Sequence, residues 1–307
     1  MVAEAGVTWT DVESPTKEDM EALSRDHPFH PLNLDDCLSR RQLPKIEEHE
    51  EHIFLLFHIP HLDDNQRLVV KSQVSIFVGK DYVVTIHGTE VKRLTSLFLN
   101  YMEDQKLRTE GMQSTPRIVH NILDALVDDL YPILSKIRGD IEEIEDKVFD
   151  QRRSVAVELS HLRRAVADLR RIVLPIRELP TEIWVKTRGF TEEDLSKYFS
   201  DVREHAEKAW ELLNEAQETV EIFKDTDYVL SNELTGKVLT VLTVIFTLSI
   251  PVIVVGAIYG MNIALPGGLG SPSPAFLGPY TSFIILMSVC AVFAAGMMIF
   301  FRRKGWL

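Results

Sequence analysis

The chain has 307 residues, 45% of them hydrophobic, and a formal net charge of −13 at pH 7. All 46 acidic residues and 29 of the 33 basic residues lie at or before Glu233, so this part carries −17 and the remainder +4. Such a division indicates an acidic domain joined to a membrane segment rather than one globule. An acidic surface repels phosphate backbones, which argues against nucleic acid as a partner.

The first third of the chain is predicted to form a β-sheet. Three segments rich in β-branched and aromatic residues, separated by polar or glycine breaks, have the composition of strands: EHIFLLFHIPHL (51–62), RLVVKSQVSIFVG (67–79) and DYVVTIHG (81–88). The two cysteines, Cys37 and Cys290, are too far apart in sequence to suggest a disulfide framework, and the N-terminus lacks the regions of a signal peptide. We therefore expect this domain in a reducing compartment, the cytoplasm.

Helical periodicity begins at Ile118. Apolar residues recur every three or four positions to Val148, which predicts one long amphipathic helix kinked at Pro132. A second helical pattern runs from Val155 to Val173 and ends near the prolines at 175 and 180.

A third helix is predicted to begin after a cap at Thr191 and to continue without a Gly or Pro until Gly236. If unbroken to Tyr259 it would be on the order of 100 Å long. Its expected apolar stripe comprises Leu195, Tyr198, Val202, His205, Ala209, Leu212, Ala216, Val220 and Phe223.

Two uncharged segments of 22 residues each, 238–259 and 280–301, are long enough to cross a bilayer. Lys237 precedes the first and Arg302, Arg303 and Lys304 follow the second, so the positive-inside rule predicts cytoplasmic termini and an outer loop in the plasma membrane.

The predicted fold is therefore an α+β cytoplasmic domain, a sheet plus helices, with a long stalk helix that continues into an α-helical two-span membrane domain. The expected domains are 1–115 (N-terminal α/β part), 116–190 (paired long helices), 191–237 (stalk helix), 238–262 (first span and signature), 263–279 (external loop), 280–301 (second span) and 302–307 (basic tail).

Two helices cannot enclose a water-filled path, so any transport requires a homo-oligomer in the lipid bilayer. Thr240, Thr243 and Thr247 form a polar stripe on the first span and could line such a path. Threonines in membrane helices more often bond to the carbonyl four residues back, and we favour that interpretation.

Catalysis is not expected, because no nucleophile, base and orienting acid occur as a set and no nucleotide-binding loop is present. Four histidines, His49, His52, His58 and His61, do not have the spacing of a closed zinc site.

The first span ends on YGMN, residues 259–262. Gly260 could be a helix C-cap and Asn262 a polar residue leaving the membrane. Alternatively, a ring of Asn262 carboxamides could hold a hydrated Mg²⁺ with neutral oxygen acceptors, because Mg²⁺ gives up its waters reluctantly.

YGMN in this position resembles the signature of the CorA family of divalent-cation channels, and the resemblance covers nearly the whole chain. Further segments carry it: residues 30–54 (HPLNLDDCLSRRQLPKIEEHEEHIF), YFSDVREHAEKAWE of the stalk, KVLTVLTVIF of the first span and the RRKGWL tail. The resemblance implies a homopentameric, non-enzymatic Mg²⁺ channel with Gly260, Met261 and Asn262 as its selectivity filter.

The resemblance also implies a pore lining and a regulatory site. Counting back from Asn262 without gaps places Leu239, Leu242, Phe246, Ile250, Ile253 and Ala257 on the pore axis; one insertion would put Thr240, Thr243 and Thr247 there instead. The same count puts Asp225, with Asp227 beside it, where family members bind a regulatory Mg²⁺ that holds the pore shut.

One departure from the family concerns the outer loop, where most members carry an acidic sequence and residues 263–279 contain no acid. This leaves open another divalent ion (Co²⁺, Ni²⁺ or Zn²⁺) or outward flux. A protein of a different class, a two-span signalling or scaffold protein, stays the alternative to passive Mg²⁺ uptake.

Overall fold

The structure is a computed structural model that describes residues 1–39, 42–62, 69–148, 155–261 and 281–306. The chain divides into two compact units, Met1–Thr226 and Asp227–Leu307. One helix, α9, crosses the boundary between them. Asn262 and the predicted external loop lie outside the described residues.

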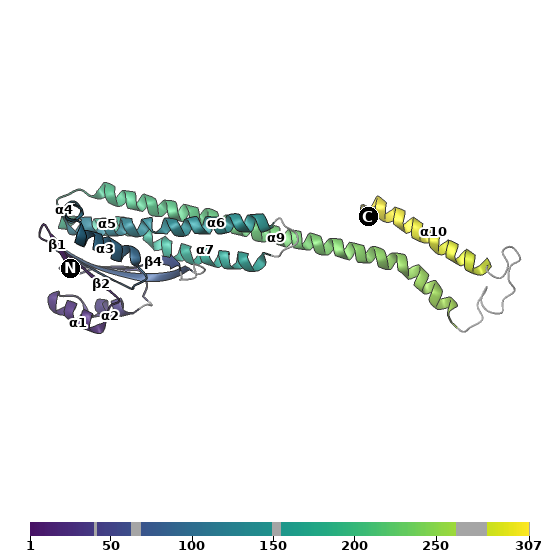
Figure 1. The fold of residues 1–307 in the computed structure, drawn as a ribbon, viewed down its shortest axis with the longest axis horizontal. Helices are drawn as coiled ribbons and strands as arrows, with labels where there is room; N and C mark the ends of the chain where they lie inside the picture. The colour runs from purple at the N-terminus through teal and green to yellow at the C-terminus, as the bar shows by residue number, and fades with distance from the viewer. Residues whose placement is uncertain (40–41, 63–68, 149–154, 262–280, 307) are drawn as a thin grey trace. The chain divides into compact units, whose positions relative to one another are not determined.

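A six-stranded sheet forms the centre of the first unit (Figure 1). Its order is β1-β2-β6-β5-β4-β3, with β2 and β6 parallel and the other neighbours antiparallel. The strands are β1 (Val2–Glu4), β2 (Val7–Glu13), β3 (Lys45–Glu48), β4 (His52–Leu62), β5 (Val69–Gly79) and β6 (Tyr82–His87). The three predicted strands are confirmed as β4, β5 and β6, and β5 pairs with both of the others.

Both faces of this sheet are buried, which explains why β4 is apolar at almost every position. Phe54 and Leu56 pack with residues of α1 (Lys17–Asp26) and α2 (Pro31–Leu38). Leu55 and Phe57 point to the opposite face and join the larger core made by the later helices.

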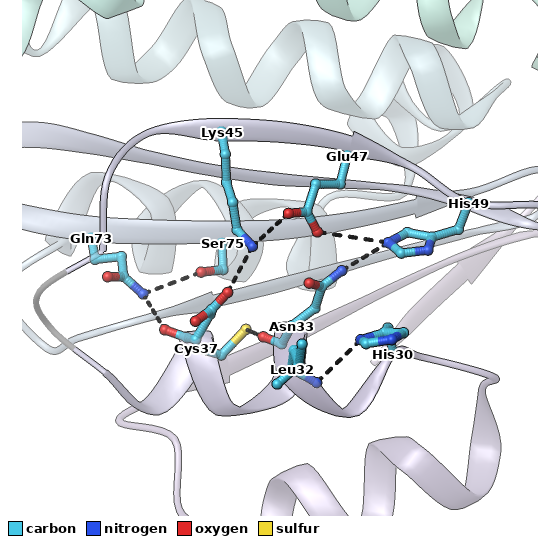
Figure 2. A network of polar contacts seen from close by, with 10 residues as sticks. His30, Leu32, Asn33, Cys37, Lys45, Glu47, His49, Gln73 and Ser75 are labelled. Atoms are coloured by element: carbon cyan, nitrogen blue, oxygen red, sulfur yellow. Dashed lines mark hydrogen bonds and ion pairs between the residues drawn. The ribbon is translucent and has the colours of Figure 1, made fainter.

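Polar contacts fasten α2 to the edge strand β3 (Figure 2). Lys45 Nζ lies 2.7 Å from both an Asp36 and a Glu47 carboxylate oxygen, and the Asn33 amide lies 2.9 Å from His49 Nε2. These residues belong to the stretch 30–54 that carries the family resemblance. Its sequence features therefore describe a structural junction between a helix and the sheet.

The helix predicted to run from Ile118 to Val148 is two helices, α5 (Thr115–Asp128) and α6 (Leu130–Val148), so the prediction of a single kinked helix was wrong. The break falls at Asp129, three residues before Pro132. Proline has no N–H to bond the carbonyl four residues back and its ring crowds that carbonyl, so the chain reorganises one turn earlier.

Some of the remaining helices were not predicted, namely α3 and α4 before Ile118 and α8 after Pro175. Pro175 lies inside α7, and the segment after it forms the unpredicted helix α8. These helices are α3 (Lys92–Glu103), α4 (Gln105–Gly111), α7 (Ala156–Ile176), α8 (Leu179–Thr187), a short 3₁₀ turn (Arg188–Phe190), α9 (Ser196–Tyr259) and α10 (Thr281–Arg303).

Helix α9 starts later than the predicted Thr191 cap. Thr191 Oγ1 accepts a hydrogen bond from Glu193 N at 3.1 Å, and Asp194 Oδ1 accepts one from Ser196 N at 3.0 Å. Two successive side-chain turns therefore precede the first helical residue. From there the helix continues for 64 residues, as predicted.

The buried positions of α9 in the first unit, together with Leu195 directly before it, recur at alternating steps of four and three residues, a heptad seam. They are Leu195, Phe199, Val202, Ala206, Ala209, Leu213, Ala216, Val220 and Phe223. The predicted stripe was wrong at three positions, where the neighbours Phe199, Ala206 and Leu213 are buried in place of Tyr198, His205 and Leu212. Both sets repeat every seven residues, but the next position of the buried set is the apolar Val220, whereas the predicted set would continue to Thr219.

Arginines on α7 pair with α9 along this seam. Arg177 makes two bonds to the Glu207 carboxylate, at 2.6 and 2.7 Å, and Arg163 Nε lies 2.9 Å from a Glu221 oxygen. Later residues of α7 meet earlier residues of α9, so the two helices run antiparallel. The bidentate, partly buried Arg177–Glu207 pair helps to fix the rotation of one helix against the other.

The second unit contains the apolar part of α9 and α10, both long and apolar enough to cross a membrane. Helix α10 ends in a Schellman motif: Gly305 has a φ of +73°, and its N–H and that of Trp306 bond to the carbonyls of Arg302 and Phe301. The Trp306 ring stacks on Phe301, with centroids 5.6 Å apart. The glycine and tryptophan of the tail therefore terminate the second span.

The seam can be tested with two adjacent leucines. Leu213 is fully buried, whereas Leu212 is 38% exposed. We expect Leu213→Ala to lower the free energy of unfolding by about 2–5 kcal/mol, and Leu212→Ala by about 1 kcal/mol or less. Denaturant unfolding of the detergent-solubilised chain, followed by tryptophan fluorescence, measures both, and equal losses would contradict the seam. The same substitution in the same helix cancels any difference in helix propensity.

Candidate ion-conducting span and metal site

The candidate pore residues lie on one face of the apolar part of α9. Their spacing of three or four residues places them on one stripe, and each is exposed in the single chain, from 43% at Leu242 to 64% at Ile253 among the larger side chains. The stripe comprises Leu239, Leu242, Phe246, Ile250, Ile253 and Ala257. It is therefore available to face other copies of the helix.

The threonine stripe has the contacts that the favoured interpretation predicted. The hydroxyls of Thr240, Thr243 and Thr247 donate to the carbonyls four residues back at 2.9, 2.7 and 2.7 Å. Each hydroxyl hydrogen is thus satisfied within the helix, as required in hydrocarbon. The oxygen keeps a free lone pair, so the alternative pore register is still chemically possible.

The first span ends at Tyr259, directly before the predicted filter. Gly260 N donates to the Gly256 carbonyl at 2.9 Å, and Met261 N to the Ile258 carbonyl at 3.3 Å. A Cβ added at Gly260 would lie 3.0 Å from the Gly256 oxygen, so the close turn favours glycine. Gly260 is not a left-handed cap, because among the described glycines only Gly6 and Gly305 have positive φ. Asn262 lies outside the described residues.

A candidate metal site occurs in the first unit between α5 and α9. Asp124 of α5 and Asp201 and His205 of α9 offer ligand atoms that all lie within 4.8 Å of one another. It is the one such group of three among the residues that the structure describes. Two carboxylates and an imidazole can bind Mg²⁺ through oxygen, and Co²⁺, Ni²⁺ or Zn²⁺ through oxygen and nitrogen.

The electrostatics of this group favour a bound cation. Burial raises the pKa of Asp124, and the charge of the neighbouring Asp128 raises it further. The buried Nδ1 of His205 has no hydrogen-bond partner among the described residues, and the nearest Asp128 oxygen is 4.0 Å away. A divalent ion here would offset the repulsion between the carboxylates and supply the missing partner for the imidazole.

Sequence reasoning missed this group, although a signal existed. Asp124 and Asp128, and likewise Asp201 and His205, are four residues apart and so share a face of a predicted helix. The missing information was which two helix faces meet. That depends on the phase of the α9 seam, which was wrong at His205 itself.

The predicted regulatory pair lies elsewhere on α9. The Asp225 side chain is 77% exposed and one of its oxygens lies 3.7 Å from Lys224 Nζ. Asp227 is half-buried and begins the second unit. Within the described residues of one chain, neither forms a three-ligand group.

The four histidines near β4 do not assemble a metal group among the described residues. The rings of His49 and His52 stack with centroids 4.7 Å apart, and His61 Nδ1 lies 2.6 Å from Ser72 Oγ. Their contacts are those of packed side chains in and beside the sheet.

Comparison with known proteins gives one family for nearly the whole chain. The family model described as CorA-like Mg²⁺ transporter protein matches residues 4–303. A putative metal ion transporter, YfjQ, of Bacillus subtilis is 28% identical over 97% of this chain and 89% of its own length. The cobalt/magnesium transport protein CorA of Thermotoga maritima is 27% identical over 98% of this chain and 83% of its own.

Solved structures share the fold at lower identity. The complete CorA magnesium transporter of Methanocaldococcus jannaschii superposes with a TM-score of 0.80 at 21% identity, over 97% of this chain and 91% of that one. The full-length CmaX protein superposes with a TM-score of 0.76 at 18% identity, over 96% and 88%. The α+β domain and the two apolar helices thus recur together in whole proteins.

The metal group predicts a cation-dependent gain in stability. Adding Co²⁺ or Mg²⁺ should raise the melting temperature of the full chain, and Asp201→Asn should remove most of that shift because a ligand is lost. Glu211→Gln, an exposed change on the same helix, is the control. The shift should also shrink as pH falls toward the raised pKa of Asp124, where protons compete with the metal. An equal shift in wild type and Asp201→Asn would eliminate this site.

Proposed function

Because the chain belongs to the CorA-like Mg²⁺ transporter family, we propose that it is a passive channel-type transporter that takes up Mg²⁺ across the plasma membrane. It is a membrane protein of two apolar helices, and the match along nearly the entire chain carries this conclusion. Curated relatives named as magnesium transporters include ALR2 of Saccharomyces cerevisiae. These names argue against the two-span signalling protein.

The transport path is proposed to lie in a homopentamer. Backbone groups in a bilayer must be satisfied within each helix, so a wet path needs several helices around an axis, and one chain supplies two. The exposed stripe of α9 that contains Leu242, Phe246 and Ile253 is the proposed lining. Bulky apolar side chains at a narrow axis can gate by dewetting. Thr240, Thr243 and Thr247 form the alternative lining.

The proposed filter is Gly260, Met261 and Asn262. Five Asn262 carboxamides would present neutral oxygens to an ion that keeps its water shell, which binds Mg²⁺ without trapping it. Residues 238–301, which include both spans and the proposed filter, contain no charged side chain, so no carboxylate competes for the ion inside the membrane. A dication moving inward gains about 4.6 kcal/mol per 100 mV, which is sufficient driving force without ATP.

Regulation by cytoplasmic Mg²⁺ is proposed to act through carboxylates of the first unit and the stalk. Asp124, Asp201 and His205 form one candidate site within a chain, and Asp225 with Asp227 is proposed as a second site between chains. In either case the bound ion offsets repulsion between carboxylates, and its loss would favour a rearrangement of α9.

Flux through reconstituted protein tests the function directly. Liposomes with an inside-negative potential should take up Mg²⁺, as followed by an internal Mg²⁺-sensitive dye. Parallel measurements with Co²⁺, Ni²⁺ and Zn²⁺ rank the ions, and a reversed gradient tests export. Absence of flux for every one of these ions in wild-type protein would refute the channel.

The filter is tested by Asn262→Ala. Because the substitution removes the acceptor carboxamide, we expect Mg²⁺ flux to change by roughly tenfold, or the ion order to change, while the oligomer stays intact by size-exclusion chromatography. Asn232→Ala, on the charged part of α9, should leave flux and selectivity unchanged. If both variants behave as wild type, Asn262 is not in the filter.

The two candidate regulatory sites can be separated by the internal Mg²⁺ concentration that closes the channel. Removing a ligand at the site that regulates should raise this concentration roughly tenfold, the effect of about 1.4 kcal/mol of lost binding. Asp225→Ala and Asp201→Ala are the two probes, and Glu211→Ala is the control. A closing concentration unchanged in both probes would rule out both sites.

A further inference from the structure

A cleft of about 750 Å³ lies in the first unit between the sheet and α7, and the proposed transport function uses none of its residues. Strands β4 and β5 and helix α7 line it. Its polar lining, which we call the basic cleft, comprises His58, Lys71, His161, Arg164, Asp168 and Arg171. The volume falls within the range of about 300–1,000 Å³ typical of small-molecule sites.

Helix α7 carries two rows of arginines with different partners. Arg163 and Arg177 of the first row pair with glutamates of α9, and Arg170 lies 4.9 Å from the Trp210 ring. Arg164 and Arg171 each follow a first-row arginine by one residue, about 100° further around the helix. The second row therefore turns away from α9 and lines the basic cleft.

Among the residues that the structure describes, the lining around the second arginine row contains more basic than acidic side chains. Asp168 is the one acidic residue of the lining, 3.9 Å from Arg164 and 3.4 Å from Arg171. Lys71 makes no ion pair with any residue that the structure describes. Three cations against one carboxylate leave a net charge of +2 in a chain whose net charge is −13. The basic cleft is a local exception to an acidic protein.

A buried polar atom points to the same place. His58 is 5% exposed, lines the cleft and has an Nε2 without a hydrogen-bond partner in the described part of the chain. Burial, with the charge of Lys71, lowers the pKa of His58 to about 4, so the imidazole is neutral at pH 7. A neutral imidazole keeps one N–H donor, which suits an anionic oxygen.

The contacts of Asp168 show that Arg164 and Arg171 can both approach one anionic group. Both guanidinium groups approach one carboxylate between them, so both can address one anionic group at that position. Lys71, on β5, is a further cation for a second anionic group. Guanidinium forks match phosphate oxygens in pairs, and Leu43, Val70 and Ile172 provide an apolar wall.

We propose that the basic cleft binds a soluble small molecule bearing two or more phosphate groups, held by Arg164, Arg171 and Lys71. The basic cleft shares no residue with the proposed ion path. Its proposed ligand is an anion, whereas the transported ion is a cation. The ligand differs from inorganic phosphate because it has one anionic group for the two arginines and a second for Lys71. It differs from a lipid headgroup because it is free in solution.

Calorimetric titration of the full chain in phosphatidylcholine nanodiscs with sodium tripolyphosphate tests this. The buffer contains no divalent ions and about 0.15 M KCl, where the Debye length of about 8 Å screens diffuse attraction. We expect saturable binding that Arg164→Gln weakens roughly tenfold and Arg164→Gln with Arg171→Gln abolishes. These side chains are 82% and 81% exposed, so folding is not at risk.

Arg138→Gln is the matched control. Arg138 is also 82% exposed and also pairs with an acid four residues later, Glu142 on α6, but it lies outside the basic cleft. Its loss should leave binding unchanged. Asp168→Asn should tighten binding severalfold, because it removes the carboxylate that competes with the ligand. A purely structural role for the arginines would not produce this gain.

Three results would overturn the proposal. They are no saturable binding of tripolyphosphate, binding that is equal in wild type and Arg164→Gln, and inorganic phosphate binding as tightly as tripolyphosphate. A lipid arm uses phosphatidic acid nanodiscs: arginine-dependent binding there, with none to soluble tripolyphosphate, would assign the cleft to a headgroup instead. Calorimetry registers binding without flux, so failure here leaves the proposed transport function unaffected.

Discussion

The heptad seam of α9 is the packing interaction on which the first unit depends. Nine positions, from Leu195 to Phe223, are buried at alternating steps of four and three residues. The seam sets the rotation of α9, which brings Asp201 and His205 to Asp124 and presents Glu207 and Glu221 to the arginines of α7. One arginine row of α7 faces α9, and the other, about 100° further around the helix, lines the cleft.

The charged residues and the long apolar segments occupy different parts of this chain. The first unit carries all the acidic residues except Asp227 and Glu233 and most of the basic ones, whereas the two spans carry no charge, because an uncompensated charge in hydrocarbon is costly. A cation that crosses such a protein must be handled by neutral oxygens in the membrane and by carboxylates in water. The YGMN end of α9 and the Asp124 group have those two chemistries.

Hydroxyl groups in the first span illustrate the cost of polarity in the membrane. Thr240, Thr243, Thr247 and Ser249 each bond to the carbonyl four residues back, so none presents an unsatisfied donor. Pro251 stays within the helix despite lacking an N–H. The span therefore keeps its helical form up to Tyr259, where Gly260 begins the turn.

Much of the architecture could be predicted from the sequence because its causes are local. Twenty-two uncharged, mostly apolar residues are long enough to span a bilayer, segments rich in β-branched residues form β4, β5 and β6, and a Gly-Trp tail closes α10 through its own backbone. The YGMN signature with its companions also sufficed to indicate the family, which the match to residues 4–303 bears out.

Only the tertiary structure decided which faces meet. The one-residue choice of Leu213 over Leu212, the Asp124–Asp201–His205 group and the basic cleft all depend on contacts between segments distant in sequence. Neighbouring apolar residues have nearly equal local preferences, so helical periodicity leaves the seam's phase open by one residue. Packing removes that ambiguity, because Phe199, Ala206, Leu213 and Val220 form one continuous apolar row that is buried in the core of the first unit, whereas the neighbouring row contains His205 and Thr219.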